Sequence, residues 1–391
     1  MSRVLLVCPE PLGHGQPAGI GIRFLEIERV LRTDGHDVTL LSAPIAAADL
    51  LPHSNNADVA VVQGHIANDF FAHARPIPTV VDLYDPFIIE NLHYYESRGA
   101  EVFTHDHATL VNSLLHGDFF LCASDAQRLF WLGMLLAVGR LNPATFEADP
   151  NLHSLIRIAP FGVPPARERT TASEPRVLFG GVYDWYDPIL AIDAIAIARE
   201  SLPQISLTFT KHPNPDLTPQ GKLADAMQHV KRRGFDFVRF EPWFGYDRRA
   251  EFFDRFALAL LTFPQSLETD LSMRTRVYDY LWGGLPIVSS PAPGTDEILK
   301  RYRCGIIVDD SSPRAFAAAI LQAFAQQNSL RSGSRDFVRE HQWPDALQPL
   351  RDFCRKPRVD AQKESFAAHM QVPERAPSML ERLKRRIGGA S

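Results

Sequence analysis

The chain has 391 residues, of which 45% are hydrophobic and 22% are charged, and its formal net charge is −5 at pH 7. This length suffices for two domains with separate cores. The slightly acidic balance argues against bulk electrostatic attraction to nucleic acid. No apolar run approaches the ~20 residues that are needed to cross a bilayer. The composition is that of an ordinary globular protein.

The cysteines and the first residues bear on the compartment. Cys8, Cys122, Cys304 and Cys354 are scattered along the chain without the spacing of a zinc site. They are expected to be buried thiols in a reducing cytosol. The chain starts with an apolar, strand-like run and shows no basic region followed by a cleavage site, so no signal peptide is expected. A cytoplasmic protein is therefore predicted.

Strand-like apolar runs alternate with helical patterns through most of the chain. Such alternation predicts parallel sheets that are covered by helices on both faces. One helix start is especially clear, because Asp187 and Pro188 supply an N-cap and a proline at the first helical position. The predicted strands are residues 4–7, 38–41, 59–62, 79–83, 119–122 and 156–159 in the first half, and 177–179, 206–210, 237–240, 257–263, 287–290 and 305–308 in the second.

The division into domains follows from a change of composition near the middle of the chain. Residues 163–175 are polar and Pro-rich and show no periodicity, which is typical of a linker. The sequence therefore predicts an α/β protein with two doubly wound domains, residues 1–165 and 166–335, that face each other across a cleft.

The end of the chain, residues 356–391, differs from the rest. It is polar, contains several prolines and is predicted to be mobile up to a short basic amphipathic helix in which Leu380, Leu383 and Ile387 share one side. Such a helix can lie on the anionic inner face of a membrane. The alternative is a solvated terminal helix or disorder, which is favoured because one short helix has little membrane affinity.

The most informative stretch is residues 268–290. A polar loop follows an apolar strand and opens a helix, and a second buried strand follows the helix. In a parallel sheet such a loop lies at the carboxyl edge, where ligands bind. The free N–H groups at the helix start, together with Arg274 and Arg276, suit a diphosphate. One turn further on, Asp279 is a candidate acceptor for the hydroxyl hydrogens of a sugar.

The segment TRVYDYLWGGLPIV (275–288) resembles the donor-binding segment of GT-B glycosyltransferases, specifically the large retaining group called family 4. The Gly-rich loop GHGQPAGIGIR (13–23) and the segment VVDLYDPF (80–87) match more loosely, and the resemblance covers about residues 1–355. It implies two Rossmann-like domains and a nucleotide sugar held mainly by the second. It also implies retention of configuration, no metal or other cofactor, and a C-terminal helix at 336–355 that crosses back to the first domain.

The resemblance implies roles for three residues of this segment. Asp279 takes the position of the second glutamate of the family pattern, which usually binds the ribose hydroxyls of the nucleotide. Thr275 and Arg276 match a pair that contacts the diphosphate in many relatives. Negative charge builds on the diphosphate as the glycosidic bond breaks, and a fixed guanidinium stabilises that charge.

The first glutamate of the family pattern is missing. Relatives have two glutamates with seven residues between them, but the position eight residues before Asp279 is Leu271. Glu268 lies eleven residues before Asp279 and is a candidate for reaching the donor sugar from a longer loop. The alternative is a solvated loop acid. Arg274 either contacts the phosphates or pairs with Glu268 or Asp270.

Relatives also place a basic pair near the donor phosphates, one member of which follows the first strand of the second domain. Here that strand runs into GGVYDWYDP (180–188), which has no Arg or Lys, so Lys211 after the next strand is a candidate replacement. Gly180 and Gly181 are expected to allow close approach of the backbone to the ligand. The loop also carries three aromatic residues that either stack on a base or sugar or pack in the core: Tyr183, Trp185 and Tyr186.

In the first domain, Gly19 and Gly21 stand before a helix. The resemblance implies that this loop faces the donor phosphate, and the alternative is an ordinary tight turn. The acceptor hydroxyl needs a group that takes its proton. Asp85 is the first candidate for that role and His65 the second. The His-Asp-His pattern in residues 103–110 is interpreted as loop residues and not as metal ligands.

The sequence supports three functions. The first is transfer of a sugar from a nucleotide-diphosphate sugar to a hydroxyl of a glycan, a lipid-linked glycan or a small metabolite. The second is a nucleotide-sugar epimerase with the same fold. The third is a non-catalytic nucleotide-sugar binding protein, which is favoured by the broken glutamate pair and the missing basic residue. No motif encodes the base, the sugar or the acceptor.

Overall fold

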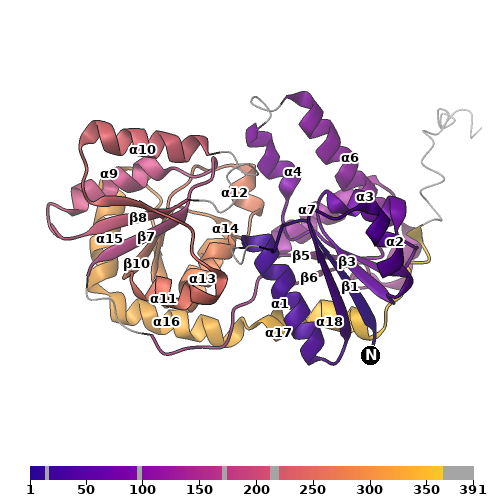
Figure 1. The fold of residues 1–391 in the computed structure, drawn as a ribbon. Helices are drawn as coiled ribbons and strands as arrows, with labels where there is room; N and C mark the ends of the chain where they lie inside the picture. The colour runs from indigo at the N-terminus through magenta and orange to yellow at the C-terminus, as the bar shows by residue number, and fades with distance from the viewer. Residues whose placement is uncertain (14–16, 95–98, 170–173, 212–219, 364–391) are drawn as a thin grey trace, which may run out of the picture.

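The computed structural model describes residues 1–13, 17–94, 99–169, 174–211 and 220–363. Two sheets of six parallel strands, each covered by helices, confirm the predicted doubly wound α/β architecture (Figure 1). Among the described residues, no helix is long and apolar enough to cross a membrane. The amphipathic helix predicted near the end of the chain lies outside the described residues.

The first sheet has the strand order β2-β1-β3-β4-β5-β6, and all its strands are parallel. The order reverses between β1 and β3, and the loops that follow these two strands therefore flank the crevice where doubly wound sheets bind ligands. The strands are β1 (Arg3–Cys8), β2 (Asp37–Ser42), β3 (Val59–Val62), β4 (Thr79–Asp82), β5 (Phe119–Cys122) and β6 (Ile156–Ile158).

The helices around the first sheet include one that the sequence did not predict. The histidines of residues 103–110 lie in helix α6 and not in a loop. The helix forms because Leu110 and Leu114, four residues apart, bury one face of it. The helices are α1 (Gly19–Thr33), α2 (Ala47–Asn55), α3 (Ile66–His73), α4 (Phe87–Glu90), η1 (Asn91–Tyr94), α6 (Ala100–His116), α7 (Asp125–Ala137) and α8 (Pro143–Ala148).

The second sheet has the order β12-β11-β10-β7-β8-β9, again all parallel. Its order reverses between β7 and β10, so the loops after these two strands flank the corresponding crevice. The strands are β7 (Arg176–Gly181), β8 (Ser206–Thr210), β9 (Val238–Glu241), β10 (Leu258–Leu261), β11 (Ile287–Ser289) and β12 (Gly305–Ile307).

The helices of the second domain include the predicted start at Asp187, whose side chain accepts a hydrogen bond from the Leu190 backbone N–H. The helices are α9 (Pro188–Ala198), α10 (Gly221–Arg233), η2 (Tyr246–Arg248), α11 (Arg249–Asp254), α12 (Leu267–Leu271), α13 (Thr275–Trp282), α14 (Pro293–Tyr302), α15 (Pro313–Ala325) and α16 (Gln327–Glu340).

The C-terminal connection consists of α16 followed by two short helices, α17 (Trp343–Ala346) and α18 (Gln348–Arg355), where the sequence predicts one helix. Pro344 and Pro349 each start a new helix, because proline has no N–H to continue the preceding one. Figure 1 shows α16 under the second domain and α18 under the first. There Arg351 pairs with Asp34 at 2.6 Å.

The described residues beyond α18 also contact the first domain. The Asp360 carboxylate pairs with Arg140 at 2.6 Å, and the Lys363 ammonium pairs with Asp118 at 2.8 Å. Both partners in the first domain are buried. The start of the segment that was predicted to be a mobile tail is therefore held by two ion pairs.

A buried ion pair anchors α1 to the first sheet. The Arg23 guanidinium on α1 pairs with Asp82 at the end of β4 at 2.6 Å, and the side chains are 1% and 0% exposed. The guanidinium also donates hydrogen bonds to the carbonyl oxygens of Ala159 and Pro160, just after β6. One side chain thus holds the first helix against two strand ends.

Because Arg23 would lose its counter-charge while remaining buried, Asp82→Ala should lower the free energy of unfolding by about 3–5 kcal/mol. The matched control is Asp58→Ala, which removes the exposed ion pair between Asp58 and Arg3. The control should cost less than about 1 kcal/mol. Urea denaturation followed by circular dichroism measures both values, and equal losses in the two variants would contradict the assignment.

Candidate functional site

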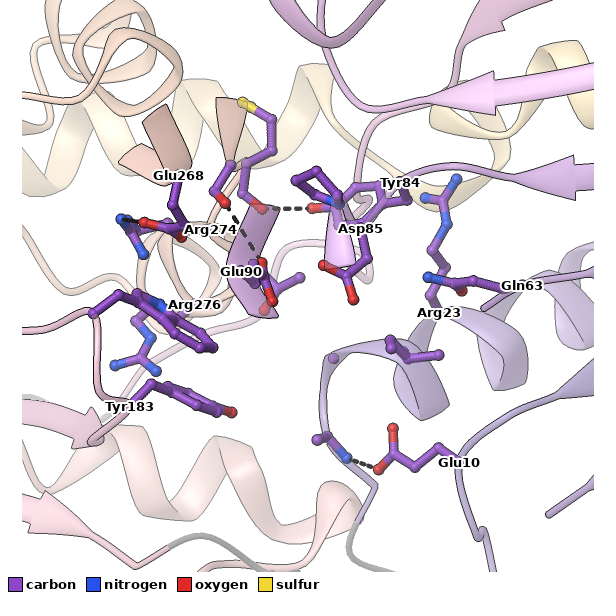
Figure 2. Close-up of a pocket in the computed structure, with 18 of the residues that line it drawn as sticks. Glu10, Arg23, Gln63, Tyr84, Asp85, Glu90, Tyr183, Glu268, Arg274 and Arg276 are labelled. Carbon is purple, nitrogen blue, oxygen red and sulfur yellow. Dashed lines mark hydrogen bonds and ion pairs between the residues drawn. The ribbon is translucent and has the colours of Figure 1, made fainter. Parts of the chain in front are cut away.

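A cavity of about 340 Å³ lies between the two domains (Figure 2). Its walls come from the loops that follow β1, β3 and β4 of the first sheet and β7 and β10 of the second, together with the starts of α1 and α13. Both crevices at which the strand order reverses therefore open into one space. The polar residues of the lining are Glu10, Arg23, Gln63, Tyr84, Asp85, Glu90, Tyr183, Tyr186, Glu268, Ser272, Arg274, Thr275 and Arg276.

Direct hydrogen bonds join the domains around this cavity. The Tyr84 hydroxyl donates to the Met273 carbonyl oxygen at 2.9 Å, and the Gln127 side-chain amide donates to the Leu271 carbonyl oxygen at 3.0 Å. Further along the cleft the Tyr246 hydroxyl donates to the Glu26 carboxylate at 2.6 Å. These hydrogen bonds hold the two domains together at the edges of the cavity.

Glu268 and Arg274 form a buried ion pair in the cavity wall. Their side chains lie 2.8 Å apart and are 1% and 3% exposed. The Arg274 guanidinium also donates to the Tyr186 hydroxyl at 3.2 Å and lies 4.2 Å from the Phe263 ring centroid. Glu268 is thus a buried residue of α12 and not a solvated loop acid, and its Oε1 has no hydrogen-bond partner within the described chain.

Arg276 lies where the large cavity meets a smaller one of about 60 Å³. Its Nη1 donates to the Gly181 carbonyl oxygen at 2.7 Å and to that of Phe179 at 3.3 Å. The guanidinium carbon lies 4.4 Å from the Tyr186 ring centroid. Helix α13 starts beside it without a side-chain cap, which leaves its first amides for a ligand.

Gly180 and Gly181 end β7 in the wall of the smaller cavity. Gly180 has a φ of +82°, and a Cβ there would lie 2.3 Å from the Tyr280 hydroxyl oxygen. The backbone conformation and the close contact both require glycine. The loop they open carries the stacked rings of Tyr183 and Trp185, whose centroids lie 4.8 Å apart.

Asp279 lines the smaller cavity together with Arg249 and Tyr246. Burial raises the pKa of the Asp279 carboxyl to about 6, although the nearby Arg249 guanidinium favours the charged form. The residue therefore faces an enclosed space in which its carboxylate lacks the solvation it has in water.

Two more carboxyl groups come from the first domain, Asp85 after β4 and Glu90 at the end of α4. Burial raises the pKa of Asp85 to about 6, and it also raises the pKa of Glu90 well above its usual value. Glu268 adds to both shifts because like charges in one site disfavour joint ionisation. Asp85 is thus placed in a cluster that can hold and release a proton near neutral pH. Sequence reasoning missed Glu90, which lies on the short helix after the VVDLYD strand.

Glu10 was also missed, and it changes the interpretation of the Gly-rich loop. Its carboxylate accepts hydrogen bonds from the backbone N–H groups of Ala18 and Gly21 at the start of α1, the latter at 2.6 Å. A Cβ on Gly21 would lie 2.9 Å from that carboxylate, whereas a Cβ on Gly19 would lie 3.1 Å from Thr275 Oγ1 across the cleft. Gly19 therefore faces the second domain, and Gly21 is required by local packing.

The two remaining candidates lie outside the large cavity. His65 lines a neighbouring cavity of about 420 Å³, where its Nε2 lies 3.0 Å from the Asp106 carboxylate and its ring stacks on His105. Asp85 and Gln63 line both spaces. Lys211 is exposed after β8 and lines none of the three cavities, so the structure does not bring it to the other candidates.

Comparison with known proteins identifies the fold. No protein-family model matches the chain, and no curated protein matches it in sequence. Among solved structures, sucrose-phosphate synthase from Thermosynechococcus elongatus has a TM-score of 0.64 at 13% identity, over 91% of this chain and 98% of that one. Anabaena HepE in complex with UDP and glucose has a TM-score of 0.61 at 13% identity, over 91% and 99%.

The pneumococcal O-GlcNAc transferase GtfA, in complex with UDP and GlcNAc, matches with a TM-score of 0.52 at 14% identity, over 76% of this chain and 56% of that one. These structural neighbours are GT-B glycosyltransferases, so the predicted GT-B fold is confirmed. At identities this low the similarity shows the fold alone.

The raised pKa of Asp279 predicts a pH-dependent stability difference. An aspartate of the unfolded chain titrates near pH ~4, whereas the folded protein keeps the Asp279 proton up to about pH 6. The folded state is therefore favoured most below pH ~4, and this contribution is lost as the pH rises through about 6. Asp279→Asn has no group that titrates in this range. Between about pH 4 and pH 7 the wild type should therefore lose roughly 2–3 kcal/mol of unfolding free energy relative to the variant. Urea denaturation across this range measures the difference, and parallel curves would contradict the raised pKa of Asp279.

Proposed function

We propose that the protein is a glycosyltransferase that moves a sugar from a nucleotide-diphosphate sugar to a hydroxyl acceptor in the cleft between its domains. The observation that carries this proposal is the position of Thr275 and Arg276. Both residues line the large and the small cavity, at the start of an uncapped helix. A diphosphate that joins a nucleoside to a sugar needs cationic and N–H groups at such a junction.

The donor then spans the two cavities. The nucleoside enters the smaller one, where Asp279 accepts hydrogen bonds from the ribose hydroxyls and Trp243 offers a stacking surface. Because this cavity measures only about 60 Å³, binding requires side chains of its lining to move. The sugar extends into the larger cavity toward Glu268. Solved structures of HepE and GtfA contain UDP, which makes uracil the first base to test.

In the proposed reaction the bond between the anomeric carbon and the diphosphate oxygen breaks, and the acceptor oxygen forms a new bond to that carbon. Arg276 and the first amides of α13 stabilise the negative charge that develops on the departing diphosphate. Asp85 takes the proton of the acceptor hydroxyl. Arg274 acts indirectly, since it holds Glu268 in place. Retention of configuration and independence of metal ions and other cofactors are part of the proposal, with guanidinium groups supplying the positive charge.

Nucleotide binding tests the donor site. In a thermal-shift panel of nucleoside diphosphates, one base should raise the melting temperature selectively, and Arg276→Ala should weaken that binding at least 10-fold because a charge-assisted contact is lost. The matched control is Arg339→Ala on α16, which removes only an exposed pair with Asp336. If Arg276→Ala responds to the panel as the wild type and the control do, Arg276 does not contact the diphosphate.

Turnover tests the reaction. Asp85→Asn should lower kcat by about 10²–10⁴-fold while nucleotide affinity is retained, because the variant cannot accept a proton. Release of nucleoside diphosphate and formation of product, followed by chromatography with and without a saccharide acceptor, separate the possible functions. An epimerase would alter the donor sugar without any acceptor, and a non-catalytic binding protein would leave it intact under both conditions. Either result would reject glycosyl transfer.

A further inference from the structure

Gln63 has an unusual environment for a buried amide. It directly follows β3, at the crevice where the strand order of the first sheet reverses. The residue is 2% exposed, yet neither its side-chain nitrogen nor its oxygen has a hydrogen-bond partner in the described structure. A buried amide without partners destabilises the fold, because no hydrogen bond compensates for the loss of its hydration. Such a cost is typical of a group that is kept for a ligand.

Gln63 lies at the boundary between two cavities. It lines both the 340 Å³ cavity and the 420 Å³ cavity, as does Asp85. Figure 2 shows its amide end directed toward Asp85 and the cavity centre, on the side opposite Arg276. A ligand hydroxyl placed beside Asp85 would therefore share its space with the Gln63 amide. Neither the nitrogen nor the oxygen of that amide has a hydrogen-bond partner among the described residues.

The charge of the cleft differs between its two sides. The described residues that line the 420 Å³ cavity include no Lys or Arg, but they include Asp69 and Asp85. The lining contains two histidines, His65 and His105, whose rings stack on each other, and His65 is paired with Asp106. In the large cavity the arginine on the first-domain side, Arg23, is committed to Asp82 and to two carbonyl oxygens.

The apolar part of the lining suits the face of a sugar ring. Ile20, Ile66 and Phe87 contribute aliphatic and aromatic surface beside the carboxylates and the amide. Alternating apolar and hydrogen-bonding surface matches a saccharide, whose ring carbons are apolar and whose hydroxyls both donate and accept. A phosphate in this space would meet the carboxylates of Asp69 and Asp85, and the described lining offers no Lys or Arg to compensate its charge.

From these observations we infer that the 420 Å³ cavity and the first-domain side of the 340 Å³ cavity form the acceptor site for an unphosphorylated saccharide, in which Gln63 binds a hydroxyl next to the one that reacts. This inference rests on the proposed function and names the class of its acceptor. It assigns Gln63 as a specificity-determining residue, and it assigns the acidic wall as the element that rejects acceptors carrying a phosphate close to the reacting hydroxyl.

Saturation-transfer NMR on the full chain, saturated with the nucleoside diphosphate selected by the thermal-shift panel, tests the inference. The probes are neutral hexoses and disaccharides paired with their 6-phosphates. Neutral members should bind at least 10-fold more tightly than their phosphorylated counterparts, and Asp69→Lys should reduce that ratio. Binding of the phosphates with equal or higher affinity would overturn the inference, and so would failure of every neutral member to bind.

Gln63→Leu separates a ligand-binding role from a structural one. Because the amide has no partner, the variant should retain or exceed the wild-type melting temperature while saccharide affinity falls at least 10-fold. Gln127→Leu is the matched structural control, since its buried amide donates to the carbonyl oxygens of Tyr84 and Leu271, and it should lower the melting temperature. Unchanged saccharide affinity in Gln63→Leu would refute the role of Gln63.

Nucleotide binding distinguishes the two proposals. If nucleoside diphosphates bind and saccharides show no preference for the neutral member of each pair, only the acceptor assignment fails. If no nucleoside diphosphate binds to the wild type, the proposed function itself fails.

Discussion

The buried ion pair between Glu268 and Arg274 is the interaction on which the cleft depends. Both side chains are almost fully removed from water, so the charge of each is compensated by the other. Their pairing fixes the first turn of α12 relative to the start of α13. It thereby places the uncapped amides of α13 and the Arg276 guanidinium at the junction of two cavities. Removal of either partner would leave a buried charge beside the proposed donor site.

The electrostatic division of the cleft follows from the same arrangement. Arg274 and Arg276 line the second-domain side together with Glu268, whereas Glu10, Asp85 and Glu90 come from the first domain. Burial and mutual repulsion raise the pKa values of Asp85 and Glu90, so the cluster retains a proton where exposed acids would have lost theirs. A leaving group that gains negative charge and a hydroxyl that loses a proton need these two environments side by side.

In the first domain a carboxylate binds the start of a helix. Glu10 occupies the amides at the start of α1, a place where many doubly wound proteins bind a phosphate. The same loop brings Gly19 close to Thr275 in the second domain. Together with the hydrogen bonds from Tyr84 and Tyr246, this contact holds the domains together at several points around the cleft. The first domain therefore contributes to the site through acids and close packing, and its arginine Arg23 is used to anchor a helix.

The sequence by itself determined the strands and the fold class, because apolar runs of strand length that alternate with helical patterns permit few other arrangements. It also indicated the segment around Thr275, since a polar loop after a buried strand is a local pattern that can be recognised without knowledge of distant residues. Only the tertiary structure decided that Glu268 is buried against Arg274, that Lys211 lies apart, and that Glu10, Gln63 and Glu90 join the cavity. These residues come from separate loops in both domains, and their burial, pairing and pKa depend on groups that are distant in sequence. The local sequence pattern therefore determines the architecture, whereas the arrangement of charged groups in the cleft depends on packing between the two domains.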